Sequence, residues 1–306
     1  MINVLDGKQF ADKNLLDKIF KRASELQIAD AKNEVPKLLT GKVIATVFFE
    51  TSTRTRLSFE SATLKLGGGV ISITDPKTSS ASKGESLEDT IKIISGYSDL
   101  IVLRHPENKA AEIAASVSPV PVINAGDGFN EHPTQALYDL YTIEKELGKI
   151  DGLKIAFLAD FRYQRNIHSL IPMFCLFKNI HLYLIGPKEL ALPQIYKDQL
   201  TSAGIKFEEP ANIESILPEI DVLYVTRVFK ERFSNEADYE RLKKSFFIDV
   251  STLEKMKPKS VILDVMPIIF EIDPAVHKDP RAAYFRQAKN GLYVRMALLL
   301  YALGVS

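Results

Sequence analysis

Phe48-Phe49-Glu50-Thr51-Ser52-Thr53-Arg54-Thr55-Arg56 is the stretch that decides the fold of the first half of the chain. It follows the apolar, β-branched run 42–48, which is typical of a buried strand, and it precedes the helical pattern 57–66. Hydroxyl and guanidinium groups therefore gather where a strand ends and a helix begins, beside backbone N–H groups and the positive end of the helix dipole. The simpler interpretation is a capped helix followed by solvated arginines. So many donors in succession favour a site that holds phosphate oxygens.

Strand and helix patterns alternate along the rest of the chain. Strands are expected at 42–49, 70–73, 99–103, 120–124, 154–159, 180–185, 221–226 and 261–265. Helices are expected between them, including one near 236–244, with a first helix at 14–26 and a last at about 282–302. Such alternation predicts parallel sheets that helices cover on both faces. We therefore expect an α/β fold of two doubly wound parallel-sheet domains, with the active site in the cleft between them.

Polar side chains follow these strands at their carboxyl ends, where the ligands of open parallel sheets collect. In the first half they are the 52–56 cluster, Arg104, His132 and Gln135. In the second half they are Arg162, Arg165, Thr226, Arg227 and the segment after Val265. This coincidence is a second, independent indication of a site.

Most of the side chains at these positions are hydrogen-bond donors or cations. Arginines, hydroxyls, one imidazole and one amide can grip phosphate oxygens and polarise a carbonyl group. Arg165 and Arg227 suit a dicarboxylate substrate. The sequence has no metal-ligand spacing, no serine–histidine–acid signature, no Gly-x-Gly-x-x-Gly after a strand and no Walker loop, so we expect neither metal nor cofactor. Group transfer through a charged tetrahedral intermediate, from which the substrate's own phosphate leaves, fits this inventory best.

Composition limits the class of protein. The 306 residues have a formal net charge of zero, so no overall field draws the chain to nucleic acid or to anionic lipid. Cys175 is the single cysteine, which excludes an internal disulfide and fits a reducing compartment. The sequence has no apolar segment of membrane-spanning length and no N-terminal apolar core of a signal peptide, and we expect a cytoplasmic protein.

Three motifs together identify a family. The 48–56 stretch, Arg104-His105-Pro106 and His132-Pro133-Thr134-Gln135 resemble the carbamoyl-phosphate half of the aspartate/ornithine carbamoyltransferases, and the similarity runs over essentially the whole chain. Four further features resemble the aspartate branch of that family: Ser79, Lys83-Gly84-Glu85, Asp160–Arg165 and Thr226–Phe233.

The resemblance implies carbamoyl transfer from carbamoyl phosphate to L-aspartate, giving N-carbamoyl-L-aspartate and phosphate for pyrimidine synthesis. It implies a carbamoyl-phosphate-binding domain over 1–133 with a returning helix at about 286–306, and an aspartate-binding domain over 134–285. Thr55, Arg104 and His132 would be the catalytic residues, which polarise the carbamoyl oxygen. Carbamoyl phosphate would contact Ser52, Thr53, Arg54, Thr55, Arg104, His132, Gln135, Ser79, Met266 and Pro267.

The resemblance also implies how the acceptor is bound and how chains assemble. Lys83, Arg165 and Arg227 would bind aspartate, and Glu50 would pair with Arg165 and Arg232 as the domains close. Ser79 and Lys83 would reach into a neighbouring subunit's site, which implies a homotrimer with shared active sites. Regulatory chains and nucleotide effectors are left open.

Departures from the family pattern all lie in the second half. The family's His-Pro-Leu-Pro-Arg is Asp264-Val265-Met266-Pro267-Ile268 here, Phe229 replaces a glutamine, and Gln164 and Asn166 replace glycine and threonine. Phenylalanine cannot make the hydrogen bonds of glutamine, at a cost of roughly 1.5–3 kcal/mol for a bond to a charged group. Two alternatives therefore stay open: a carbamoyltransferase for another amine, and a catalytically silent chain that binds carbamoyl phosphate.

Overall fold

The structure, a computed structural model, describes residues 2–75, 77, 79–227, 235, 239–240 and 246–305. The chain divides into two compact units: Met1–Tyr138 with His168–Met173 and Ala288–Ser306, and Asp139–Ile167 with Phe174–Gln287. The unit boundaries fall inside three helices, α5 (Pro133–Leu147), α6 (Arg165–Phe174) and α10 (Tyr284–Leu303).

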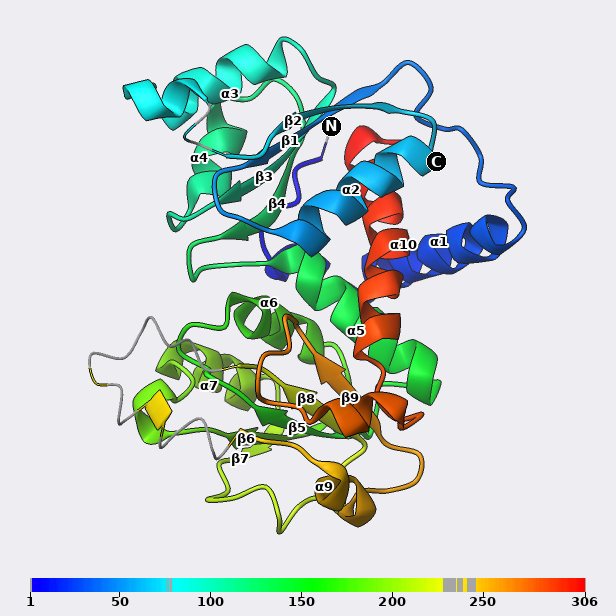
Figure 1. Ribbon diagram of the computed structural model, residues 1–306, viewed down its shortest axis with the longest axis vertical. Helices are drawn as coiled ribbons and strands as arrows, with labels where there is room; N and C mark the ends of the chain where they lie inside the picture. Colours follow the sequence, from blue (N-terminus) through cyan, green and yellow to red (C-terminus); the bar gives the residue numbers. More distant parts are fainter. Residues whose placement is uncertain are drawn as a thin grey trace. The chain divides into compact units, whose positions relative to one another are not determined.

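Four parallel strands form the sheet of the first unit (Figure 1). In the order β2-β1-β3-β4 they are Gly69–Ile73, Val43–Phe48, Leu100–His105 and Val122–Asp127. Apolar residues run through β1 and β3 without alternating with polar ones, because helices bury both faces of the sheet. The carboxyl ends of β1 and β3 lie side by side, since Phe48 is in register with Arg104.

Helices cover both faces of this sheet. On one face, α3 (Leu87–Ser95) and α4 (Ala110–Val117) share a buried apolar cluster with Ala45 and Val47 of β1. On the other face lies α2 (Thr53–Lys65), whose Glu60 accepts a hydrogen bond from the Thr46 hydroxyl at 3.0 Å. This unit also contains α1 (Lys13–Ala31) and the 3-10 turns η1 (Lys8–Phe10) and η3 (Ser80–Lys83).

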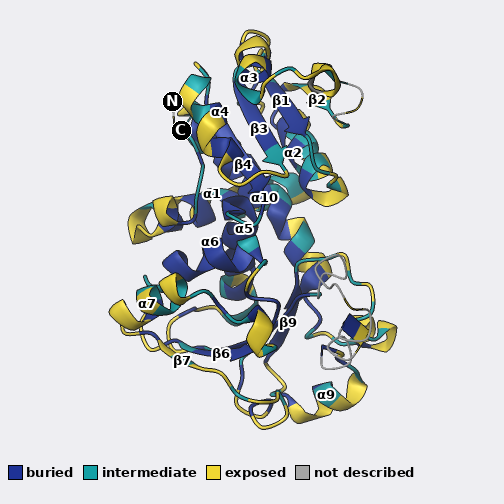
Figure 2. Ribbon diagram, turned by 90° about the vertical axis from the view of Figure 1, so that its left-hand side faces the viewer, coloured by how far each residue is buried: buried dark blue, intermediate teal, exposed yellow. Residues whose placement is uncertain are grey.

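Five parallel strands form the sheet of the second unit. In the order β7-β6-β5-β8-β9 they are Lys206–Glu208, His181–Ile185, Lys154–Leu158, Val222–Val225 and Val261–Asp264. Leu158, Val225 and Ile262 point into one buried cluster, which also includes Leu253 of α9 (Val250–Lys255). Phe157 and Tyr224 point to the opposite face, where their ring centroids are 5.1 Å apart. Figure 2 shows β6 and β9 mostly buried and the outer surface of α9 exposed.

The remaining elements of the second unit are short. Among the described residues they include α7 (Gln194–Ser202) and the 3-10 turns η4 (Lys188–Leu190) and η6 (Pro274–Lys278). No helix in the described part of the chain is both long and apolar enough to cross a bilayer.

The predicted fold class is confirmed: both sheets are parallel and lie among helices. The sequence pattern predicted neither β7 nor α9, and the helical pattern before α3 began at residue 57, whereas α2 begins at Thr53. The helix predicted near 236–244 lies mostly outside the described residues.

Candidate functional site

The start of α2 holds the hydroxyl and arginine cluster that the sequence singled out. Ser52 occupies the N-cap position with an extended backbone (φ −159°), yet its side chain makes no capping hydrogen bond to the helix. The first N–H groups of a helix have no partner within the helix itself. Thr53 and Arg54 are exposed and Thr55 is buried, so donors of three kinds surround one helix end. This is the geometry of an anion site.

Arg104 extends from the adjacent strand end. The Phe49 N–H donates to its carbonyl at 2.8 Å, which ties the end of β1 to β3. Arg104 Nη2 donates to Glu50 Oε1 at 2.9 Å, and Nη1 to the Ala125 carbonyl at 3.4 Å. Its side chain is only 12% exposed, so this guanidinium is fixed beside the α2 cluster.

His132 and Gln135 lie at the start of α5, as predicted. Both are buried, and the Gln135 N–H donates to the His132 carbonyl at 3.0 Å. The hydroxyl of Tyr138 donates to Gln135 Oε1, which orients the amide. The first unit thus brings Ser52–Thr55, Arg104, His132 and Gln135 to the strand ends and helix starts of a single sheet.

The buried carboxyl group of Glu131 is linked to His132 through Ser169. The His132 N–H donates to Ser169 Oγ at 2.8 Å, and the Ser169 hydroxyl donates in turn to Glu131 Oε2. The Gly7 N–H donates to the same carboxyl oxygen at 3.1 Å. Burial raises the pKa of Glu131 to about 7, although the bonds from Ser169 and Gly7 oppose the shift.

Arg295 supports α2 from the buried side. Only 2% exposed, it donates through Nη1 to Ser58 Oγ at 2.6 Å, and Ser58 Oγ donates to the Arg54 carbonyl at 2.6 Å. Its guanidinium carbon also lies 4.9 Å from the ring centroid of Tyr138, the residue that holds Gln135. One buried cation therefore braces both helix starts of the candidate site.

The polar loop after β2 presents the next two predicted residues. Ser79 precedes η3, and its carbonyl accepts from the Ser82 N–H at 3.1 Å. Lys83 ends η3 and is exposed. Pro76 and Thr78 of this loop lie outside the described residues.

Arg165 and Arg227 follow neighbouring strands of the second sheet, β5 and β8. Gln164 Nε2 donates to the Arg227 carbonyl at 3.3 Å, so the two predicted acceptor residues lie on segments that are hydrogen-bonded to each other. The adjacent Thr226 hydroxyl is fully buried and has no hydrogen-bond partner among the described residues. Both arginines are partly exposed.

Met266 and Pro267 lie directly after β9. The peptide bond between them is cis, and Met266 has a left-handed backbone with φ 55°. The Asp264 carboxylate accepts from the Met266 N–H at 2.5 Å. Phe229 and Arg232 lie outside the described residues, and the pairing of Glu50 with Arg165 and Arg232 stays a prediction.

The supporting roles of Glu131 and Arg295 were not predicted from the sequence. Glu131 directly precedes the His132 motif, and this adjacency was the available signal. For Arg295 the available signal was a cation within the apolar part of the last helix. Nothing in the sequence linked either of them to its partner, because Glu131 bonds to Ser169 and Arg295 to Ser58, which are far apart in the chain.

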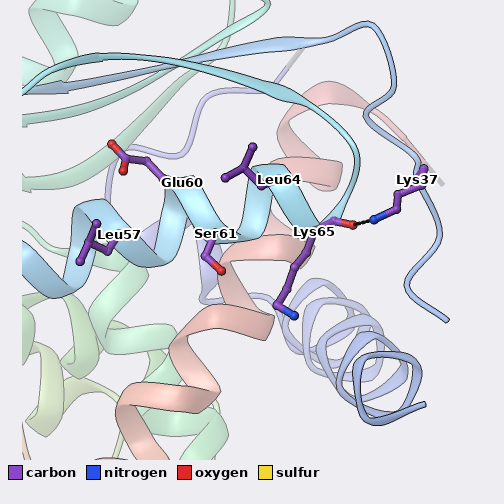
Figure 3. Close-up of a pocket in the computed structure, with 6 residues that line it drawn as sticks. All are labelled: Lys37, Leu57, Glu60, Ser61, Leu64 and Lys65. Atoms are coloured by element: carbon purple, nitrogen blue, oxygen red, sulfur yellow. Dashed lines mark hydrogen bonds between the residues drawn. The ribbon is translucent and has the colours of Figure 1, made fainter. Parts of the chain in front are cut away.

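A hollow of about 480 Å³ lies on the exposed face of α2 (Figure 3). Its lining residues are Lys37, Leu57, Glu60, Ser61, Leu64 and Lys65. Leu57 and Leu64 are 49% and 60% exposed, and none of the predicted substrate-binding residues lines the hollow. An open, partly apolar surface of this kind suits a protein neighbour better than a phosphate.

Two family models match the chain, one to each half. The carbamoyl-P binding domain of aspartate/ornithine carbamoyltransferase matches residues 3–145, and the Asp/Orn binding domain of the same family matches residues 151–302.

Known proteins match over nearly the whole chain. The aspartate carbamoyltransferase catalytic subunit of Methanocaldococcus jannaschii is 48% identical over 299 residues, which cover 98% of this chain and 97% of that protein. The solved catalytic subunit of M. jannaschii aspartate transcarbamoylase has a TM-score of 0.93 at 47% identity, covering 99% of this chain and 98% of that one. Aspartate transcarbamoylase from Trypanosoma cruzi, solved with carbamoyl phosphate and aspartate, has a TM-score of 0.90 at 35% identity and covers 99% and 96%.

Proposed function

The chain belongs to the aspartate/ornithine carbamoyltransferase family, and we propose from this premise that it is an aspartate carbamoyltransferase. It transfers the carbamoyl group of carbamoyl phosphate to the amino group of L-aspartate, releasing N-carbamoyl-L-aspartate and phosphate. The observation that carries this proposal is the near-full-length similarity to aspartate carbamoyltransferases, and the gathering of Ser52–Thr55, Arg104, His132 and Gln135 in the first unit supports it.

Carbamoyl phosphate binds at the start of α2 in this proposal. Ser52, Thr53, Arg54 and Thr55 hold the phosphate oxygens with hydroxyls, a guanidinium and helix N–H groups. Arg104 adds a second guanidinium, and its contact with Glu50 at 2.9 Å supports a fixed orientation. Thr55, Arg104 and His132 polarise the carbamoyl oxygen, and Gln135 holds the carbamoyl nitrogen.

Aspartate binds through Arg165, Arg227 and Lys83, three cations for two carboxylates. The bond between Gln164 and the Arg227 carbonyl supports a joint role for the two arginines. Met266 and Pro267 present backbone carbonyls to the carbamoyl nitrogen. Residues 1–133 with 286–306 would form the donor domain and 134–285 the acceptor domain.

The chemistry needs positioning and charge stabilisation. The neutral amine of aspartate attacks the carbamoyl carbon, and the carbonyl oxygen gains negative charge facing Thr55, Arg104 and His132. The carbon–oxygen bond to phosphate then breaks, and the departing phosphate takes the proton that the amine loses. Each step uses groups of the two substrates and donors of the protein.

A homotrimer with shared sites is part of the proposal. Lys83 is exposed on the loop after β2, as a residue that reaches a neighbouring subunit must be. The exposed Leu57 and Leu64 of α2 offer an apolar face to a second copy. The cytoplasmic location and any regulatory chains stay predictions.

One assay tests the function. The purified chain is mixed with carbamoyl phosphate and a panel of amino acids and other amines, and phosphate release is measured, with Arg54→Ala as the inactive control. We expect turnover with L-aspartate. Turnover with another amine alone would favour the altered acceptor pocket that Phe229 and Ile268 suggest. No turnover at millimolar substrate would favour a silent carbamoyl-phosphate-binding chain.

A further inference from the structure

Five buried polar residues of the second unit are linked in a row by hydrogen bonds, four of them through their side chains and Asp264 through its backbone N–H. Each comes from a different element, α6, β8, α5, α10 or β9, and each is at most 3% exposed: Asn166, Tyr224, Asp139, Gln287 and Asp264. Because all five residues are buried, solvent cannot replace a lost bond.

The direction of every bond in the row is fixed. Asn166 Nδ2 donates to Tyr224 Oη at 2.7 Å, and Tyr224 Oη donates to Asp139 Oδ2 at 2.5 Å. Gln287 Nε2 donates to the other carboxylate oxygen of Asp139 at 2.7 Å. The Gln287 carbonyl oxygen accepts from the Asp264 N–H at 3.0 Å. Turning over either amide would bring two donors or two acceptors together, so the row admits one arrangement.

One end of the row adjoins the proposed acceptor residue Arg165, and the other end reaches Met266, which is proposed to face the carbamoyl nitrogen. Asn166 directly follows Arg165 in the first turn of α6. Asp264 accepts from the Met266 N–H at 2.5 Å and so holds a residue with a left-handed backbone, which a non-glycine residue adopts only under constraint. Asn166 and Asp264 are also two of the positions at which the sequence departs from the family pattern. The two departures therefore belong to one connected structure.

We infer that Asn166, Tyr224, Asp139, Gln287 and Asp264 are positioning residues, which set the Arg165 segment and the Met266 peptide relative to each other for the acceptor amino acid. The inference rests on the proposed function and deepens it. A row that only stabilised the fold would affect both substrates alike, whereas a positioning row acts mainly on the acceptor.

Tyr224→Phe tests the inference because it removes one oxygen from the middle of the row. We expect the KM for aspartate to rise about fivefold or more. We expect the Kd for carbamoyl phosphate, measured by calorimetry without acceptor, to change less than the KM for aspartate, since the phosphate contacts lie in the first unit and only the Met266 and Pro267 carbonyls come from the second. Tyr183→Phe is the matched control: Tyr183 is a buried tyrosine of the same sheet outside the row, and neither constant should move.

A charge relocation gives the second test. Asp139→Asn places an amide nitrogen next to the donating amide of Gln287 or next to the donating hydroxyl of Tyr224. Gln287→Glu places two carboxylates next to each other. Each single variant should therefore have a raised KM for aspartate. The double variant moves the carboxylate from position 139 to position 287, and every hydrogen bond of the row again has one donor and one acceptor. Its KM for aspartate should therefore return toward the wild-type value.

The outcomes separate the inference from the function. If the wild type turns over aspartate while Tyr224→Phe leaves its KM unchanged, or while the double variant is no better than the worse single variant, the inference is wrong and the function stands. A wild type without aspartate turnover would contradict both. Tyr224→Phe keeps the test open even if the single charge variants do not fold.

Discussion

Glu131 makes the stability of the first unit depend on pH. Its pKa of about 7 in the folded protein exceeds the ordinary 4.5 of a glutamate, so the folded state binds the proton more tightly than the unfolded state. The stability that this proton contributes is present below pH 4.5 and is lost as the pH rises through 7, a loss of about 3 kcal/mol for such a shift. The side chain of Glu131→Gln cannot titrate. The free energy of unfolding of this variant, measured in urea, should therefore rise by about 3 kcal/mol relative to wild type between pH 4 and pH 8.

An exposed glutamate provides the control for this prediction. Glu112 lies on the outer surface of α4, and Glu112→Gln should change the free energy of unfolding equally at both pH values. A difference between Glu131→Gln and wild type that stays constant from pH 4 to pH 8 would mean that Glu131 is not the titrating group.

Phe229 carries a prediction about acceptor affinity. Because its ring cannot supply the hydrogen bonds of the glutamine that the family pattern places there, Phe229→Gln should lower the KM for aspartate, by up to about tenfold. Steady-state phosphate release at varied aspartate measures it. An unchanged or higher KM would indicate that the pocket is built around the ring, and the KM for carbamoyl phosphate provides the internal reference.

At the scale of elements, α10 stabilises the start of α2 through Arg295. Arg295→Met keeps an unbranched side chain but removes the bond to Ser58 and the contacts with the rings of Phe59 and Tyr138. Since Ser58 and Tyr138 hold Arg54 and Gln135, we expect about a tenfold weaker Kd for carbamoyl phosphate by calorimetry. Lys289→Met on the exposed face of the same helix should leave the Kd unchanged. An equal effect of the two variants would refute the role of Arg295.

Elements with a long apolar pattern could be predicted from the sequence, and short or polar ones could not. The buried runs of β1 and β8 were found because their residues are apolar on both faces. The first turn of α2 is polar, so apolar periodicity placed the helix start at 57 instead of Thr53. β7 has only three residues, Lys206–Glu208, and two are charged, a composition that gives no strand signal.

The same contrast holds for the candidate site. Side chains within one motif, such as His132 and Gln135, could be placed together from their spacing. The bonds that hold them come from distant segments, as Ser169 does for His132 and Arg295 for the start of α2. Such contacts depend on the tertiary fold, and no local pattern encodes them.

At the scale of the whole molecule, shared sites predict complementation between two inactive variants. Lys83→Ala removes a residue supplied to a neighbour, and Arg54→Ala removes one that a chain keeps for itself. Either variant alone should be inactive. After unfolding and refolding together in equal amounts, each mixed trimer contains one intact site, so roughly a quarter of wild-type phosphate release should return.

The refolded mixture has its own controls. Each variant refolded alone must stay inactive, and a wild-type sample refolded in the same way sets the maximum. A mixture that regains no activity, although size-exclusion chromatography shows trimers, would mean that every chain carries a complete site.

Gly7 has a practical consequence for protein engineering. A Cβ atom at this position would lie 2.1 Å from the Ser169 carbonyl oxygen, and the Gly7 N–H also reaches Glu131. Residues near the amino terminus therefore pack against Ser169 and Glu131, the two residues that support His132. Trimming them, or fusing a rigid partner immediately before them, should impair catalysis, so a purification handle belongs on a long spacer.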